Sequence, residues 1–147
     1  MKPNLRVQTV VKHCAYECAR QRSGEMSVGW MFDAWIETIN EQALTNQQKP
    51  TVGFIKDLAK IVEPVKNANG FRTLPVIINE TVIPVTDFES NLSSLLENGW
   101  FHENAEQFYF AFEKLHPFID GNGRMGNILY NLLNGTIYNP APTPVWK

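Results

Sequence analysis

The sequence is poor in cysteine and has no long hydrophobic run. Its two cysteines, Cys14 and Cys18, lie four positions apart on what would be one helix face, so we expect no disulfide framework. No apolar stretch reaches the roughly 18 residues of a membrane-spanning helix, and the first residues lack the pattern of a cleaved signal peptide. These absences predict a cytoplasmic protein with no membrane partner.

A surplus of one charge sign is also missing. The 147 residues include 13 Lys plus Arg and 15 Asp plus Glu, which gives a formal net charge of −2. This balance does not favour nucleic acid or an anionic membrane as a partner. Hydrophobic residues make up 44% of the chain, which excludes a disordered protein. The length predicts a single domain over residues 1–147 with one hydrophobic core.

Apolar residues recur at helical spacing through most of the chain, which predicts an all-α protein. The third helix should carry Val65 at the end of its apolar stripe. The fourth should open with a capping box formed by Thr86 and Glu89, and Gly135 should close the last one. The helices are predicted over residues 5–21, 26–44, 50–65, 86–98, 103–115 and 122–134.

Residues 72–85 break the helical pattern. β-Branched residues cluster on both sides of Asn79 and Glu80, which predicts a short β-hairpin. The segment 136–147 is rich in proline and is expected to be extended. Trp146 in this segment either fills a core position or docks on a partner, and the sequence leaves both open.

The segment between the last two predicted helices carries the chemistry. It reads HPFIDGNGR, beginning at His116. Gly121 and Gly123 permit a turn whose N–H groups, with the following helix N-terminus, can surround an anion, and Arg124 adds a charge suited to phosphate. Asp120 is an oxygen ligand suited to Mg²⁺, and His116 can act as a general base near neutral pH. A glycine-rich turn alone would indicate only a helix connection, but this combination predicts a phosphoryl- or nucleotidyl-transfer site.

The motif resembles that of the Fic family, H-P-F-x-[D/E]-G-N-G-R-x-x-R, and every position through Arg124 matches. The preceding segment ENAEQFYFAFEKLHPF, the hairpin after GFRT and the run ILYNLLNG extend the resemblance to about residues 50–135. The resemblance implies a Fic-like helical bundle in which the short β-hairpin is the flap that holds the target.

Fic proteins transfer AMP from ATP, with Mg²⁺, to a hydroxyl group of a target protein. By this resemblance, His116 would deprotonate the Ser, Thr or Tyr of the target, and Asp120 would hold Mg²⁺. The nucleotide would lie against Gly121, Asn122, Gly123, Arg124, Asn127, Tyr130 and Asn131. The target would pair as a strand with the flap at Val76, Ile77 and Ile78.

The sequence departs from the family motif at its last arginine, where Asn127 stands. The change removes charge-assisted hydrogen bonds to the outer phosphates, each worth roughly 1.5–3 kcal/mol. Two alternatives therefore stay open: a Doc-like phosphotransferase toxin, and a degenerate module that binds nucleotide or a partner without turnover. An arginine restored at position 127 is expected to raise the affinity for ATP.

The segment SSLLEN, which contains Glu97, matches the letters [S/T]-x-x-x-E-[G/N] of the autoinhibitory motif in the family. An ordinary amphipathic helix is the favoured interpretation, because the segment lies between flap and motif and Asn127 offers no charge to pair with Glu97. If the protein is restrained, an antitoxin-like inhibitor on a separate chain is the expected partner.

Overall fold

The computed structural model describes residues 5–45 and 49–145. They form six α-helices, a short 3₁₀ helix and one two-stranded antiparallel sheet, so the predicted all-α class with a hairpin is confirmed. No helix in these residues is long and apolar enough to cross a membrane. Trp146 lies outside the described residues. The elements are α1 (Val7–Arg20), α2 (Met26–Thr45), α3 (Val52–Val62), β1 (Val76–Ile78), β2 (Thr81–Ile83), α4 (Phe88–Gly99), η1 (His102–Asn104), α5 (Ala105–Leu115) and α6 (Asn122–Asn134).

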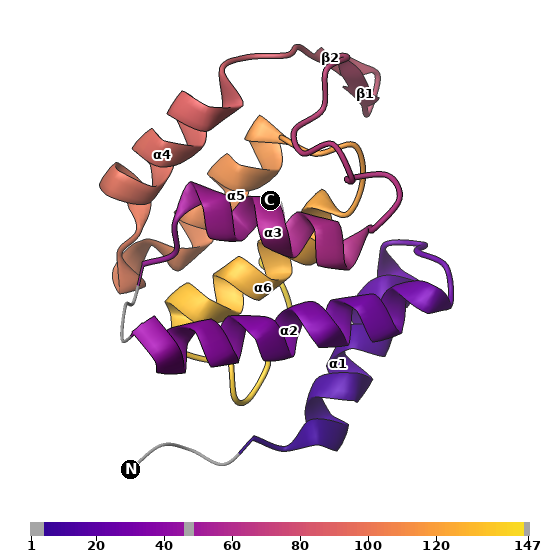
Figure 1. The fold of residues 1–147 in the computed structure, drawn as a ribbon, viewed down its shortest axis with the longest axis vertical. Helices are drawn as coiled ribbons and strands as arrows, with labels where there is room; N and C mark the ends of the chain where they lie inside the picture. The colour runs from indigo at the N-terminus through magenta and orange to yellow at the C-terminus, as the bar shows by residue number, and fades with distance from the viewer. Residues whose placement is uncertain (1–4, 46–48, 146–147) are drawn as a thin grey trace.

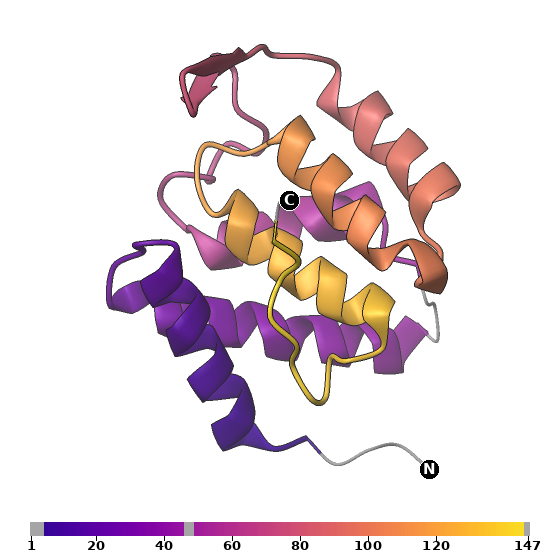
Figure 2. The same ribbon diagram turned by 180° about the vertical axis from the view of Figure 1, so that it is seen from behind.

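Helix α6 is the centre of the bundle. It contacts α2, α3 and α5, and nine of its 13 residues are buried. Helices α2 and α3 lie on one side of it and α5 on the other, while α4 packs on α5 as an outer layer (Figure 1). The view from behind shows α1 beside α2, and the hairpin projecting from one end of the bundle (Figure 2). The motif loop therefore begins the most buried helix of the fold.

Two sequence predictions about the helices are wrong in detail. Helix α3 ends at Val62, so Val65 lies beyond it and its side chain is 84% exposed. The N-cap of α4 is Asp87, whose side chain accepts a hydrogen bond from the Ser90 N–H over 3.1 Å. The predicted capping residue, Thr86, instead accepts from the side chain of Asn91. Aspartate is a better N-cap than threonine, which favours a helix that begins after Asp87.

The hairpin forms as predicted. Val76 pairs with Ile83 and Ile78 with Thr81, and the turn between the strands has positive φ at Asn79 and Glu80, as a tight hairpin requires. Both strands are edges, because the sheet has two strands. Their backbone groups are therefore available for pairing with another extended segment.

Candidate active site

The motif loop is fixed by its two ends. His116 closes α5 in a left-handed conformation with φ of 49°, and its N–H bonds to the carbonyl of Phe112 over 3.0 Å. Gly121, with φ of 78°, starts α6, and a Cβ at this position would lie 2.8 Å from the side chain of Val62. Position 121 therefore requires glycine for both its conformation and its close approach to α3.

His116 lies where the loop meets the flap. It shares a cavity of about 380 Å³ with the flap residues Ile78, Asn79 and Ile83. Burial lowers the pKa of His116, so the imidazole is neutral at neutral pH. Its Nδ1 lies 3.4 Å from the carbonyl oxygen of Glu113, which can only accept, so Nδ1 carries the proton and Nε2 keeps a free lone pair. The imidazole thus has the form that a general base needs.

Arg72 joins the flap to this loop, and the sequence analysis did not identify it. The side chain is buried, and its Nε donates to the carbonyl of His116 over 2.6 Å. The two terminal nitrogens donate to the carbonyls of Leu74, Ile83 and Pro84, on both sides of the hairpin. A buried arginine bonded to so many backbone acceptors has a positioning role, which composition and spacing do not reveal.

Asp120 presents an ionised carboxylate at the surface of the loop. Its Oδ2 lies 2.7 Å from Lys66 Nζ, and its Oδ1 accepts the Gly121 N–H over 2.7 Å. Burial alone would raise its pKa, but these hydrogen bonds and the nearby positive charges outweigh burial and hold the pKa below its usual value. The carboxylate is 40% exposed.

This carboxylate fits Mg²⁺ by its chemistry, because hard oxygen ligands suit that ion. No group of three or more His, Cys, Asp or Glu side chains in residues 5–45 and 49–145 could hold a metal without other ligands. An ion at Asp120 would therefore take its remaining ligands from water and from substrate phosphates.

The side chains of Arg124 and Asn122 are buried beneath the motif loop and are not exposed on its surface. Arg124 is buried, with Nη2 2.7 Å from Glu63 Oε1, and among the described residues its Nε has no hydrogen-bond partner. Asn122 bonds through both side-chain atoms to the backbone of Phe118 and so braces the turn. No described side chain caps the N-terminus of α6, so the N–H groups of its first turn can receive an anion.

Asn127 and Asn131 are fully buried on α6, farther from the loop. The Oδ1 of Asn127 lies 2.8 Å from His13 Nε2 on α1. Asn131 bonds to the backbone N–H and carbonyl of Ala141, so it holds the extended C-terminal segment on α6. Tyr130 is half-buried, with its ring edge-on to Tyr109. The roles predicted for these residues toward a nucleotide stay predictions.

Side chains of α1 and of the residue that follows it reach α6. The side chain of Gln21, which follows α1, lies directly against Gly123. Glu17 is buried on α1 and accepts from Arg20 and Gln21, while its Oε1 has no partner among the described residues. The sequence analysis identified no role for Glu17, because its position on an apolar helix face gives no signal of the polar cluster there.

Glu113 is a half-buried acid that sequence reasoning missed. It lies one helical turn before His116, and its Oε1 has no hydrogen-bond partner in the described chain. Burial raises the pKa of Glu113 to about 7, and Arg20 opposes the shift in part. A Cβ on Gly126 of α6 would collide with this carboxylate, so the acid is held against the central helix.

Glu97 is exposed on α4, beside Ser93 and Ser94. The buried side of α4 carries Phe88, Leu92 and Leu96, as in an ordinary amphipathic helix. No salt bridge in the described chain links Glu97 to the motif loop. An inhibitory role for Glu97 stays a prediction that the geometry does not favour.

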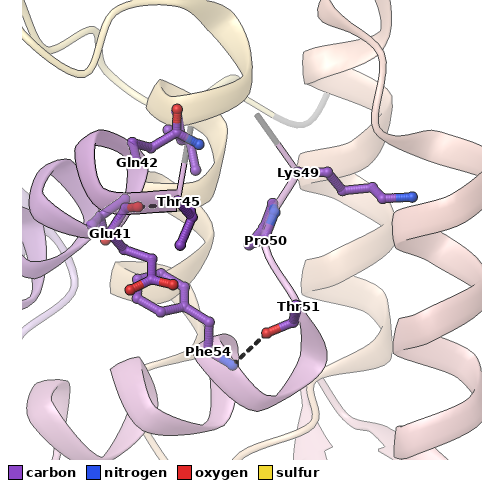
Figure 3. A pocket seen from close by; sticks show the side chains of 9 residues that line it. Glu41, Gln42, Thr45, Lys49, Pro50, Thr51 and Phe54 are labelled. Atoms are coloured by element: carbon purple, nitrogen blue, oxygen red, sulfur yellow. Dashed lines mark hydrogen bonds between the residues drawn. The ribbon is translucent and has the colours of Figure 1, made fainter. Parts of the chain in front are cut away.

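A small cavity lies between the end of α2 and the start of α3 (Figure 3). Its volume of about 20 Å³ matches a single water molecule rather than a substrate. Thr51 beside it caps α3 by accepting from the Phe54 N–H over 3.0 Å. Leu132, in the last turn of α6, lines the cavity. The cavity therefore lies at the opposite end of α6 from the motif loop.

Comparison with known proteins shows the family of the chain. The profile of the Fic/DOC family matches residues 33–133, which begins inside α2, ahead of residue 50 where the motif resemblance began. A Fido domain-containing protein of Dictyostelium discoideum is 57% identical over 35 residues. That stretch covers 24% of this chain and 24% of the relative, so the chain spans about a quarter of the length of the curated relative it matches.

Proposed function

The chain belongs to the Fic/DOC family, a family of AMP-transferases and related proteins, and on that premise we propose that it transfers AMP from Mg²⁺-bound ATP to a hydroxyl group of a target protein. One observation carries the proposal. The neutral imidazole of His116 opens into a cavity shared with the flap, and four residues later the ionised Asp120 precedes the uncapped N-terminus of α6. A base, a metal ligand and an anion site are thereby joined in one loop.

The base step follows from the tautomer of His116. Nε2 takes the proton of the target hydroxyl. The hydroxyl oxygen then forms a bond to the α-phosphorus of ATP, and the bond from that phosphorus to the pyrophosphate oxygen breaks, so that pyrophosphate leaves. Nδ1–H stays directed at the carbonyl of Glu113, which orients the ring. Arg72 holds the backbone of His116 and so fixes the distance between base and flap.

The phosphates are held by groups of this chain at the start of α6. The N–H groups of its first turn and the positive end of the helix dipole favour the negative charge that develops in the reaction. The Asp120 carboxylate would hold Mg²⁺, which when bound neutralises phosphate charge. The buried ion pair of Arg124 with Glu63 joins the start of α6 to the end of α3 and so stabilises the loop.

The flap offers a strand edge to the target. Ile78 and Ile83 line the cavity beside His116, and Ile77 is exposed on the hairpin. A target segment that pairs with a strand edge would place a side chain in this cavity, where the base lies. We expect an inhibitor, where one exists, to be a separate protein, because Glu97 is exposed on α4.

A labelling experiment tests the proposal. The protein and a cell lysate are incubated with Mg²⁺ and ATP labelled at the α- or the γ-phosphate, with His116→Asn as the inactive control. Label from the α-position that depends on His116 would support AMP transfer. Label from the γ-position alone would support the Doc-like phosphotransferase, which the neutral, buried Asn127 keeps as the second candidate. Absence of both labels would favour a binding module without turnover.

A further inference from the structure

The arginines beside the motif loop are occupied by protein acceptors. Arg124 is buried and paired with Glu63, and Arg72 is buried and bonded to four backbone carbonyls. Turning the guanidinium of Arg124 toward a ligand would leave the buried carboxylate of Glu63 unpaired, and turning that of Arg72 would break four hydrogen bonds, which is costly. These two arginines therefore stabilise the fold and are not placed to bind a ligand at the exposed side of the site.

Lys66 is placed differently. It follows α3, and its side chain is 56% exposed, with Nζ 2.7 Å from Asp120 Oδ2. Lys114, by contrast, lines the flap cavity on the target side. The Lys66–Asp120 pair is open to water, and such pairs contribute little to stability. The pair can therefore exchange partners at small cost when a ligand arrives.

The next residue, Asn67, holds Lys66 in this place. Asn67 is fully buried, and its Nδ2 donates to the carbonyls of Ala59 and Asp120, each over 3.0 Å. Its Oδ1 accepts the N–H of Asp120 over 3.4 Å. The side chain of Asn67 thus holds the segment after α3 on the motif loop, whatever the side chain of Lys66 does. The backbone of Lys66 is therefore fixed while its ammonium group can move, which suits a phosphate ligand.

We propose that Lys66 binds the outer phosphates of the nucleotide, exchanging Asp120 for phosphate when the carboxylate takes up a divalent cation. The inference rests on the proposed use of Mg²⁺ and ATP and deepens it. It identifies Lys66 as a residue that distinguishes ATP and ADP from AMP. The proposal has a second consequence. Lys66 and the divalent cation compete for the same carboxylate oxygen of Asp120, so Lys66 weakens the binding of the cation.

Calorimetric titration of ATP, ADP and AMP in the presence of Mg²⁺ tests this assignment. Lys66→Gln should weaken the binding of ATP and ADP by roughly three- to tenfold and leave that of AMP unchanged within about twofold. Lys66→Arg should keep the wild-type affinities, because it keeps the charge. Lys60→Gln, which removes an exposed lysine of α3, is the matched control and should change nothing.

Two further results separate the possible failures. Lys66→Gln should lower the Mg²⁺ concentration needed for half-maximal ATP binding, because it removes the competitor at Asp120, and should reduce the salt dependence of ATP binding. Equal affinities in Lys66→Gln and wild type, or an equal loss for AMP, would overturn the role of Lys66 while leaving the transferase proposal intact. Failure of the wild-type protein to bind any of the three nucleotides would overturn both.

Discussion

The Nε atom of Arg72 donates a hydrogen bond to the backbone carbonyl of His116 over 2.6 Å. The same guanidinium reaches the carbonyls of Leu74, Ile83 and Pro84 at the two ends of the hairpin. One buried side chain therefore fixes the position of His116 relative to the hairpin. Because the sheet has two strands and projects from the bundle, this anchor replaces the packing that a larger sheet would supply.

Weakening that anchor should loosen the flap. Arg72→Lys keeps a positive charge but cannot reach four carbonyls, so we expect a loss of about 2–3 kcal/mol in the free energy of unfolding. Urea unfolding measures this loss, and hydrogen exchange at residues 76–83 should accelerate. Arg22→Lys, at an exposed position, is the control and should leave both unchanged. Unaltered exchange in the hairpin of Arg72→Lys would contradict the anchoring role.

His116→Ala should reduce transfer by about 10²–10⁴-fold, the usual contribution of a general base. It should also destabilise the protein by about 1 kcal/mol, because residue 116 has φ of 49° and alanine resists that conformation. His116→Asn removes the base but tolerates the left-handed conformation, so its melting temperature should stay closer to wild type. Activity assays and thermal unfolding of the two variants together separate the catalytic from the conformational effect. Full transfer activity in His116→Asn would refute the assignment of the base.

Glu113 should make stability depend on pH. Its pKa rises from 4.5 in the unfolded chain to about 7 in the folded protein, so the folded state binds the additional proton. The stabilisation from this proton is complete below about pH 4.5 and is lost as pH rises through about 7. Glu113→Gln should therefore match wild type near pH 4.5 and exceed it by up to about 3 kcal/mol at pH 8. Unfolding at both pH values measures this difference.

The control for this prediction is Glu106→Gln, an exposed acid on the same helix. It should change the free energy of unfolding by less than about 0.5 kcal/mol at either pH. If the difference in free energy of unfolding between Glu113→Gln and wild type is the same at both pH values, folding does not raise the pKa of Glu113.

The burial of Asn127 reverses the expectation for Asn127→Arg. The residue is fully buried and bonded to His13, so an arginine would bring an unpaired charge under α1. We now expect a loss of about 2–4 kcal/mol in stability and no gain in ATP affinity. Asn134→Arg, at the half-buried end of the same helix, should be tolerated. Tighter ATP binding with an unchanged melting temperature would show that position 127 is open to the nucleotide.

The sequence predicted the helices, the hairpin and the motif loop because each has a local signal. Helical spacing, β-branched clusters around Asn79 and the HPFIDGNGR segment depend on neighbours in the chain, and the elements formed close to their expected bounds. Val65 was misplaced because apolar spacing continues past Val62, where the backbone of Glu63 leaves the helix.

The interior of the site could not be predicted in the same way. Nothing local distinguishes Asn67 as a clamp, or Arg124 as the partner of Glu63, because both roles depend on segments more than 50 residues away. The motif suggested an arginine open to phosphate, but the energetic need to pair the buried Glu63 determines where that guanidinium lies.

The long reach of these bonds also bears on the order in which the chain folds. Asn67 joins Asp120 across 53 positions, Arg124 joins Glu63 across 61, and His13 joins Asn127 across 114. Helical proteins usually fold fast because their contacts are local, but each of these bonds needs a long loop to close first. The helices can therefore begin to form early, while Lys66 and the motif loop come together only after this long segment has closed. A chain emerging from the ribosome would therefore lack all three of these bonds until α6 had been synthesised and packed.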